Sequence, residues 1–373
     1  MTRICHITDA SAGWEQRVAI EQLLDRLPRD SIEQHTVATH RDARAALARM
    51  GSGAALIPSR LGLAMLAAPR LRGFLSRRSV DLIHAWGTSA AVAARTASDK
   101  PVVVELFDPA AARRDVKLLR TLALSGRLTV VTSCAIVRRR LIEGGFEADR
   151  VVVIRPGVDF ARINAYRRGT VRDDLGVARS DTLVCLVPPA TRRGGYFEAS
   201  YAVSVINHVV GAHWVVIPGR SHEIGRIARF QGALPMQRTL VRVDDRIGAE
   251  ALIAVSDVLL IAARDDVSTT SIAWAMASRT AVVAAAGYAV TEMVAHKVNG
   301  LLFKQPPGRS MLASIAHCLG DRVALEKVRE AAHGQAYEIF GLRRYVEDHV
   351  RLYENVLSDR PVDSGIVDPA RVE

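Results

Sequence analysis

The fold of this 373-residue chain is decided by the stretch Asp257–Phe303, DVLLIAARDDVSTTSIAWAMASRTAVVAAAGYAVTEMVAHKVNGLLF. Its first segment, Val258–Ala263, is short and wholly apolar, as a strand buried on both faces of a parallel sheet must be. A polar turn follows at Asp265–Ser271, and then an apolar helical segment at Ile272–Ala277. A second apolar strand is predicted at Ala281–Ala286. The order strand, turn, helix and strand predicts a parallel α/β sheet.

The polar turn has the composition of an anion site. Its last four residues, Ser268, Thr269, Thr270 and Ser271, are of the types favoured at helix N-caps. We expect their backbone N–H groups and hydroxyls to face outward and to bind a phosphate or pyrophosphate at the helix start. The alternative is that they only cap the helix.

The same stretch resembles the nucleotide-sugar signature of glycosyltransferase family 4, whose members are retaining enzymes of the GT-B fold. In that signature an acid is followed, after seven residues, by a glutamate in the next helix. Asp266 falls on the first acid, and Ala273–Val283 falls on the helix and the following strand. Trp274 stands where the glutamate would hold the donor ribose, and an indole offers one donor and no acceptor. The resemblance implies that Asp266 binds the donor sugar, unless Asp265 or Asp266 simply caps the helix.

The organisation of the chain predicts two Rossmann-like, doubly wound α/β domains that face a cleft. Repeated strand–helix units place an N-terminal acceptor domain over residues 1–165 and a C-terminal nucleotide-sugar domain over 166–340. The segment Val151–Ile163 resembles the junction of the family. An amphipathic helix at 341–358 resembles the family's C-terminal helix, which crosses back to the N-terminal domain. Residues 359–373 lack periodicity and are expected to be disordered.

A basic turn after a predicted strand is a second candidate for phosphate binding. It contains Arg192, Arg193 and Gly194. The family uses a basic residue and a glycine here to neutralise the donor pyrophosphate, and the arginine fork suits phosphate oxygens. We expect Arg193 to contact the phosphate, with a solvated loop arginine as the alternative. Pro188 stands near the place of a further arginine of the family.

The N-terminal domain matches the family only in part. Gly13 is what remains of the glycine-rich turn that lies near the donor phosphates. Phe107 replaces a histidine beside the transferred sugar and has no proton to exchange, so Asp108 is the catalytic candidate that faces the cleft. His84 lies at another strand end, where a lone histidine is more often structural, and Trp86 replaces a further histidine.

A third donor-binding element is predicted around Glu292, which matches a glycine-glycine-x-x-glutamate element of the family. The preferred alternative is that Glu292 caps a helix that begins near Val290. His296 and Lys297 are expected in the last turn of that helix, where cations suit the dipole.

The charge of the chain favours anionic partners, because its formal net charge is +11. The segment Pro58–Ser79 carries five arginines and no acid among apolar residues. This pattern suits an anionic membrane surface, with an ordinary surface helix as the preferred alternative. No helix-turn-helix, zinc or single-strand-binding motif accompanies the charge, so nucleic acid is the least favoured partner.

Composition sets the remaining expectations. Hydrophobic residues make up 49% of the chain, but no apolar run reaches the roughly 18 residues of a spanning helix, and the N-terminus lacks a signal-peptide core. We therefore expect a cytoplasmic protein, with peripheral attachment to the inner face of the membrane as a variant of this prediction. Neither a cofactor nor a metal site is predicted. The cysteines are scattered along the chain and are expected to be buried free thiols: Cys5, Cys134, Cys185 and Cys318.

Two functions follow from these patterns. The first is an enzyme that transfers a sugar from a nucleoside-diphosphate sugar to a glycan or lipid-linked acceptor, as the resemblance implies, with retention and without a metal. The second is a catalytically inactive relative that serves as a binding or scaffold protein. Trp274, Phe107 and Pro188 favour the second, because each puts an apolar residue where the family has a polar one.

Overall fold

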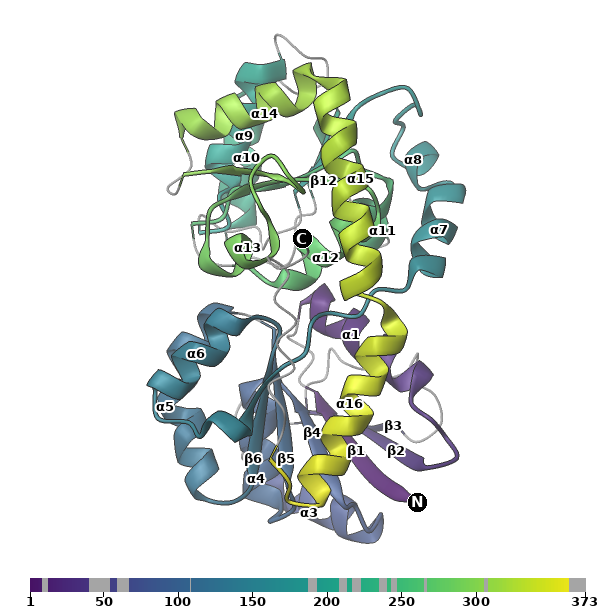
Figure 1. Cartoon of the computed structure of the whole chain (residues 1–373), viewed down its shortest axis with the longest axis vertical. Helices are drawn as coiled ribbons and strands as arrows, with labels where there is room; N and C mark the ends of the chain where they lie inside the picture. The colour runs from purple at the N-terminus through teal and green to yellow at the C-terminus, as the bar shows by residue number, and fades with distance from the viewer. Residues whose placement is uncertain are drawn as a thin grey trace. The chain divides into compact units, whose positions relative to one another are not determined.

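The structure is a computed structural model in which the chain divides into two compact units (Figure 1). Unit 1 combines Met1–Gly157 with Leu342–Val367, and unit 2 contains Val158–Gly341. The structure describes residues 1–8, 13–39, 54–58, 67–107, 109–186, 193–207, 213–216, 223–234, 240–242, 247–264, 267–304 and 308–361.

Unit 1 is built on a seven-stranded parallel sheet with the strand order β3-β2-β1-β4-β5-β6-β7. The central strands are short and apolar, and every residue of β4, β5 and β6 is buried, as the sequence predicts for a sheet covered on both faces. The strands are β1 (Thr2–Thr8), β2 (Ile32–Ala38), β3 (Ala54–Leu56), β4 (Leu82–Trp86), β5 (Val102–Leu106), β6 (Leu128–Thr132) and β7 (Val151–Val153).

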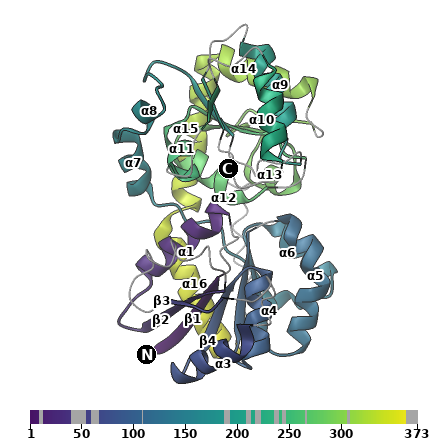
Figure 2. The same ribbon diagram turned by 180° about the vertical axis from the view of Figure 1, so that it is seen from behind.

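Helices cover both faces of this sheet. One hydrophobic core joins α1 and α16 to one face, through Leu23, Leu82 and Leu352 among others. The other face carries α3 and α4, as comparison of Figures 1 and 2 shows. The helices of unit 1 are α1 (Trp14–Arg26), α3 (Ala68–Arg77), α4 (Thr88–Ala97), α5 (Pro109–Leu124), α6 (Ala135–Glu143), the 3₁₀ helix η4 (Ala148–Arg150) and α16 (Leu342–Leu357).

Unit 2 repeats the plan with a six-stranded parallel sheet of order β10-β9-β8-β11-β12-β13. Its strands are β8 (Leu183–Leu186), β9 (His213–Val216), β10 (Leu240–Arg242), β11 (Val258–Ile261), β12 (Ala281–Ala285) and β13 (Leu301–Phe303). Its helices are α7 (Phe160–Arg168), α8 (Val171–Asp174), α9 (Tyr196–Asn207), α10 (Ile224–Gly232), α11 (Ala249–Val255), α12 (Thr269–Ala277), α13 (Tyr288–Met293), α14 (Arg309–Gly320) and α15 (Arg322–Ile339). The predicted class of two doubly wound α/β units is confirmed.

Each sheet has one point at which the strand order reverses direction. In unit 1 this point lies between β1 and β4, and in unit 2 it lies between β8 and β11. Ligands of open α/β sheets bind outside the carboxyl ends of the two strands at such a point. The topology alone therefore directs attention to the segments that follow β8 and β11.

The boundary between the units lies at Gly157 and not at residue 165 as predicted. The Asp159 carboxylate accepts hydrogen bonds from the backbone N–H groups of Ala161 and Arg162, and so begins α7. Arg162 then pairs with the buried Glu250 of α11, at 3.2 Å, which ties α7 to unit 2.

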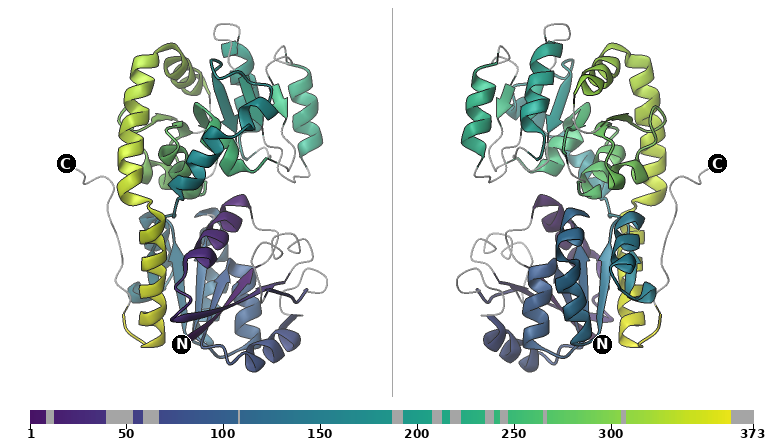
Figure 3. Two further views of the ribbon diagram at one scale, coloured as in Figure 1. Left: turned by 90° about the vertical axis from the view of Figure 1, so that its right-hand side faces the viewer. Right: turned by 90° about the vertical axis from the view of Figure 1, so that its left-hand side faces the viewer.

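The helix predicted at 341–358 corresponds to α16, which belongs to unit 1 and lies beside its sheet (Figure 3). Gly157 is in close contact with this helix, because an added Cβ would lie 2.6 Å from Cγ of Tyr345. Just after the helix, the Asp359 carboxylate pairs with Arg150 at 3.1 Å. The rest of the predicted tail, residues 362–373, lies outside the described residues.

All four cysteines are buried free thiols, as predicted. Burial raises the pKa of Cys185 and Cys318 to about 12, and it raises the pKa of Cys5 well above the usual range. These thiols are therefore protonated at neutral pH and poor nucleophiles. Among the helices described, none combines the length and the apolar character that crossing a bilayer requires.

Candidate functional site

The reversal point of unit 2 is formed by a tight turn at residues 193–195. Gly195 has φ +77°, and an added Cβ would lie 1.8 Å from the carbonyl oxygen of Ala262, just after β11. The backbone N–H of Arg264 donates to the carbonyl of Arg193 at 2.8 Å. Glycine is therefore required here, both for its left-handed backbone and for the close approach of two main chains. The turn after β8 and the segment after β11 are held together.

Two arginines border this turn. Arg193 is exposed, and Gly194 beside it is buried. Arg264, which the sequence analysis did not single out, donates from Nε to Glu198 Oε1 at 3.1 Å. A glutamate partner thus neutralises Arg264, and the assignment of Arg193 as a phosphate ligand stays a prediction.

The start of α12 differs from the predicted open anion site. Ser268 is the N-cap, and its hydroxyl accepts from the backbone N–H of Thr270 at 3.3 Å. The Ser271 hydroxyl donates to the carbonyl of Ser268 at 3.0 Å. Thr269, Thr270 and Ser271 are buried and do not face outward as predicted. Capping thus uses two hydroxyls, while the buried Thr269 Oγ1 has no hydrogen-bond partner among the described residues.

Trp274 is part of the interior of unit 2. Its side chain is fully buried in α12, and its Nε1 has no hydrogen-bond partner in the part of the chain that the structure describes. An indole N–H that is buried without a partner costs free energy. Because the Trp274 side chain fills the interior of unit 2, this position has a structural role.

The third predicted donor element has a different geometry. Helix α13 begins at Tyr288, with Gly287 as its N-cap, so Glu292 lies near its end and cannot cap its start. The helix ends at Met293, before His296 and Lys297, and the predicted dipole role of these two cations is wrong. Both belong instead to the turn into β13, where His296 Nδ1 accepts from the backbone N–H of Leu302 at 2.9 Å.

The reversal point of unit 1 is held by Gln16, which lies in α1 just after the N-cap Gly13. Its Nε2 donates to the Trp86 carbonyl at 2.7 Å and to Thr8 Oγ1 at 3.3 Å, and so bridges the ends of β4 and β1. Phe107 stacks on Trp86 with 5.8 Å between ring centroids. The two aromatic replacements noted in the sequence therefore pack against each other.

Three of the predicted site residues cannot be placed. Asp108, Arg192 and Asp266 lie outside the described residues, as does Pro188. Their assignments stay predictions. The described candidates that topology brings to one place are Arg193 and Gly194 at the turn, while Gly13 lies in unit 1.

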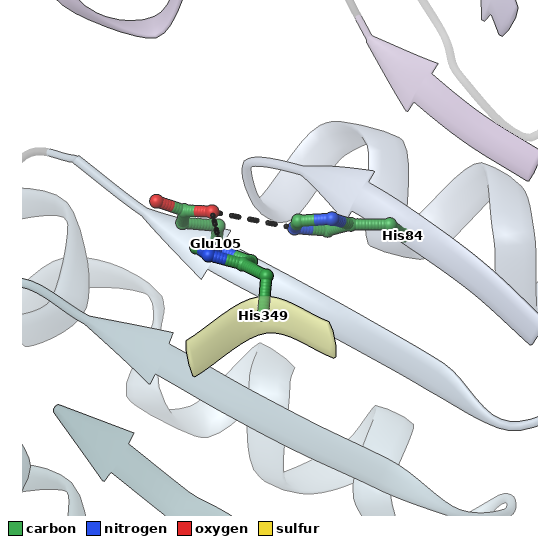
Figure 4. Close-up of side chains that lie close together, drawn as sticks. All are labelled: His84, Glu105 and His349. Carbon is green, nitrogen blue, oxygen red and sulfur yellow. Dashed lines mark hydrogen bonds and ion pairs between the residues drawn. The ribbon is translucent and has the colours of Figure 1, made fainter. Parts of the chain in front are cut away.

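A buried polar cluster in unit 1 was not predicted. It consists of His84 on β4, Glu105 on β5 and His349 on α16 (Figure 4). Glu105 Oε2 lies 3.1 Å from His349 Nε2 and 3.4 Å from His84 Nε2. His349 is 244 residues from Glu105 in sequence, so no local pattern could reveal the contact. His84 is not a lone histidine, since Glu105 and Tyr353 face it, and its predicted structural role stays a prediction.

The electrostatics of the cluster favour an ionised carboxylate. Burial alone would raise the pKa of Glu105, but the attraction of His349, its hydrogen bond and the nearby His84 lower this pKa to about 2. Burial lowers the pKa of His84, an effect that Glu105 partly offsets. Burial also lowers the pKa of the neighbouring His6 well below its usual value, and His84 adds to this. The cluster thus holds a carboxylate among imidazoles, with His84 and His6 neutral at neutral pH.

Comparison with known proteins agrees with the geometry. Residues 16–162 match the Glycosyltransferase Family 4 profile. No curated protein matches the chain. Among solved structures, HepE from Anabaena in complex with UDP-glucose has a TM-score of 0.80 and 18% identity, covering 95% of this chain and 100% of its own.

Two further solved structures share the fold. A glycosyltransferase from Rickettsia africae has a TM-score of 0.77 and 16% identity over 96% of this chain and 99% of its own. Sucrose-phosphate synthase from Thermosynechococcus elongatus has a TM-score of 0.75 and 13% identity over 96% of this chain and 100% of its own. These matches establish the GT-B fold along the chain.

Proposed function

From a Glycosyltransferase Family 4 match over residues 16–162 and a GT-B fold, we propose that this chain is a glycosyltransferase. Its donor is a nucleoside-diphosphate sugar, from which it transfers a hexosyl group to a glycan or lipid-linked acceptor. The observation that carries the proposal is the 193–195 turn at the reversal point of unit 2, where topology places the ligand of an open α/β sheet. The HepE structure supports a donor of this kind, because it contains UDP-glucose.

The chemistry follows from the charge that develops on the leaving group. As the bond to the sugar breaks, negative charge gathers on the nucleoside diphosphate, and preorganised donors stabilise it. Arg193, in the turn after β8, would supply one of these donors. Asp266 would orient the sugar, and Asp108 would face the acceptor. Retention of configuration and transfer without a metal complete the proposal.

Nucleotide binding tests this assignment directly. We expect millimolar UDP or GDP to raise the melting temperature by several degrees, since ligand at 100 times its Kd adds about 2.7 kcal/mol to the stability. Arg193→Ala should remove most of the shift but leave the melting temperature of the free protein unchanged, because this side chain is exposed. Arg322→Ala, an exposed arginine at the start of α15, is the matched control. No shift with either nucleotide, or equal shifts in all three proteins, would count against the proposal.

An inactive binding or scaffold protein is the second candidate function. The buried indole of Trp274 and the stack of Phe107 on Trp86 favour it, because both replace polar groups of the family with packed rings. A glutamate at position 274 would bury a charge in a helix, so restoring the family residue is a poor test. A turnover assay is the better test. Hydrolysis of a sugar nucleotide, or transfer of its sugar, by the wild-type protein would exclude the inactive function.

We further propose a cytoplasmic enzyme that contacts anionic lipid through the basic residues of α3. Leu71 and Leu75 of this helix are buried, so only its exposed arginines are available to lipid. Removing Arg70 and Arg77 together should cost about 2 kcal/mol of attraction to an anionic surface, which is about 30-fold in vesicle affinity. Co-sedimentation with phosphatidylserine vesicles measures this, with Lys100→Ala as the control. Equal sedimentation of all variants would assign α3 an ordinary structural role.

A further inference from the structure

The outer nitrogen of His349 fixes the tautomer of this histidine. His349 Nδ1 lies 2.8 Å from the backbone carbonyl of Tyr345, and a carbonyl only accepts, so this nitrogen carries the hydrogen. In a neutral ring, His349 Nε2 then has a lone pair, and it lies 3.1 Å from the lone pairs of Glu105 Oε2. His84 Nδ1 lies 2.8 Å from the Tyr353 hydroxyl, which can donate or accept, so this contact is compatible with either tautomer of His84. A proton or a metal ion must therefore lie between His349 Nε2 and Glu105 Oε2.

A proton on His349 Nε2 and a metal ion differ in how closely they tie His84 to the carboxylate. A proton on His349 Nε2 would bond this nitrogen to Glu105, but His84 Nε2 is buried and has no hydrogen-bond partner among the described residues. Both nitrogens face the same carboxylate oxygen, at 3.1 Å and 3.4 Å. Two ligands bound at 2.0–2.1 Å to a tetrahedral ion lie about 3.3 Å apart. The two nitrogen–oxygen separations match this distance, and all three atoms lie within 4.8 Å of one another.

The second layer of contacts also suits a metal site. The Tyr345 hydroxyl donates to Glu105 Oε1 at 3.3 Å, so each of the three ligands has an outer partner. Such partners orient the ligands of metal centres. Two imidazoles and one carboxylate favour Zn²⁺ and its neighbours over Mg²⁺ and Ca²⁺, which prefer oxygen. The ligand atoms lie within 4.8 Å of one another, and the three residues are buried.

We propose that His84, Glu105 and His349 bind a divalent transition-metal ion, Zn²⁺ in preference to Mg²⁺ or Ca²⁺, which fastens α16 to the sheet of unit 1. A water molecule would occupy the fourth position. Two ligands come from the adjacent strands β4 and β5, and the third comes from α16. The ion has a structural role, because its ligands join α16 to β4 and β5. The inference does not depend on the proposed transferase activity.

Metal analysis of the full chain tests the proposal. After incubation with ZnCl₂ and gel filtration, we expect about one zinc per chain, and no magnesium or calcium after the same treatment. His349→Ala should lose this zinc. His317→Ala, an exposed histidine of α14, should retain it. Zinc at the wild-type level in His349→Ala, or no zinc in the wild type, would overturn the proposal.

A second measurement covers the case in which His349→Ala does not fold. Treating the wild-type protein with a strong chelator should lower its melting temperature by several degrees, and stoichiometric Zn²⁺ but not Mg²⁺ should restore it. Replacement by Co²⁺ should give visible absorption bands typical of a tetrahedral nitrogen–oxygen site. A melting temperature that neither the chelator nor Zn²⁺ changes would show that the cluster holds a proton only.

Discussion

Gly195→Ala is expected to destabilise unit 2 by on the order of 3 kcal/mol and to abolish the stabilisation by UDP. A left-handed backbone costs an alanine about 1–2 kcal/mol. The remainder comes from the added Cβ, which would lie 1.8 Å from the Ala262 carbonyl oxygen, and main-chain atoms cannot move aside as a side-chain end can. Relief of this clash must separate the turn after β8 from β11, and with it the hydrogen bond from Arg264 to the Arg193 carbonyl.

Urea unfolding and the nucleotide thermal-shift assay measure the two effects of this substitution. The control is Gly334→Ala in α15, where an added Cβ would have no neighbour within 4 Å. In a helix interior this change should stabilise by about 0.5–1 kcal/mol and leave nucleotide binding unchanged. If Gly195→Ala were as stable as wild type and bound UDP equally well, the turn would not be the rigid donor site that we propose.

Glu105→Ala is expected to cost about 3–5 kcal/mol of stability, because removing one partner of a buried charged group leaves the others unpaired. In unit 1 this substitution removes the carboxylate that three groups face, namely the Tyr345 hydroxyl, His349 and His84. The cost falls on the docking of α16, which supplies Tyr345 and His349.

The contrast with a surface pair makes this prediction specific. Glu33 also pairs with a cation, Arg3 at 3.2 Å, but both side chains are well exposed, at 39% and 45%. Glu33→Ala should therefore cost about 1 kcal/mol or less. Denaturant unfolding of both variants measures the difference, and circular dichroism shows whether α16 is lost. Similar small losses in the two variants would mean that the buried cluster contributes no more than a surface salt bridge.

Local patterns were sufficient to predict many elements of the fold. The sequence predicts that β11 begins at Val258 and β12 at Ala281, as they do in the structure, because apolar runs and turn residues delimit them. Helix α4, which is rich in small residues, and helix α15 have no strong local signal and are not predicted from the sequence. The basic turn was predicted as a site, but the need for Gly195 was not, since it depends on the approach of Ala262 from another strand.

The sequence by itself determined the two α/β units and the candidate turn at Arg193, because strand and helix periods and turn chemistry act over short distances along the chain. Only the tertiary structure decided that the first turn of α12 and Trp274 are buried, and that His349 meets Glu105 and His84. Burial and charge pairing depend on which distant segments pack together. A helix residue that meets the first sheet 244 positions further along the chain leaves no local mark of that contact in the sequence.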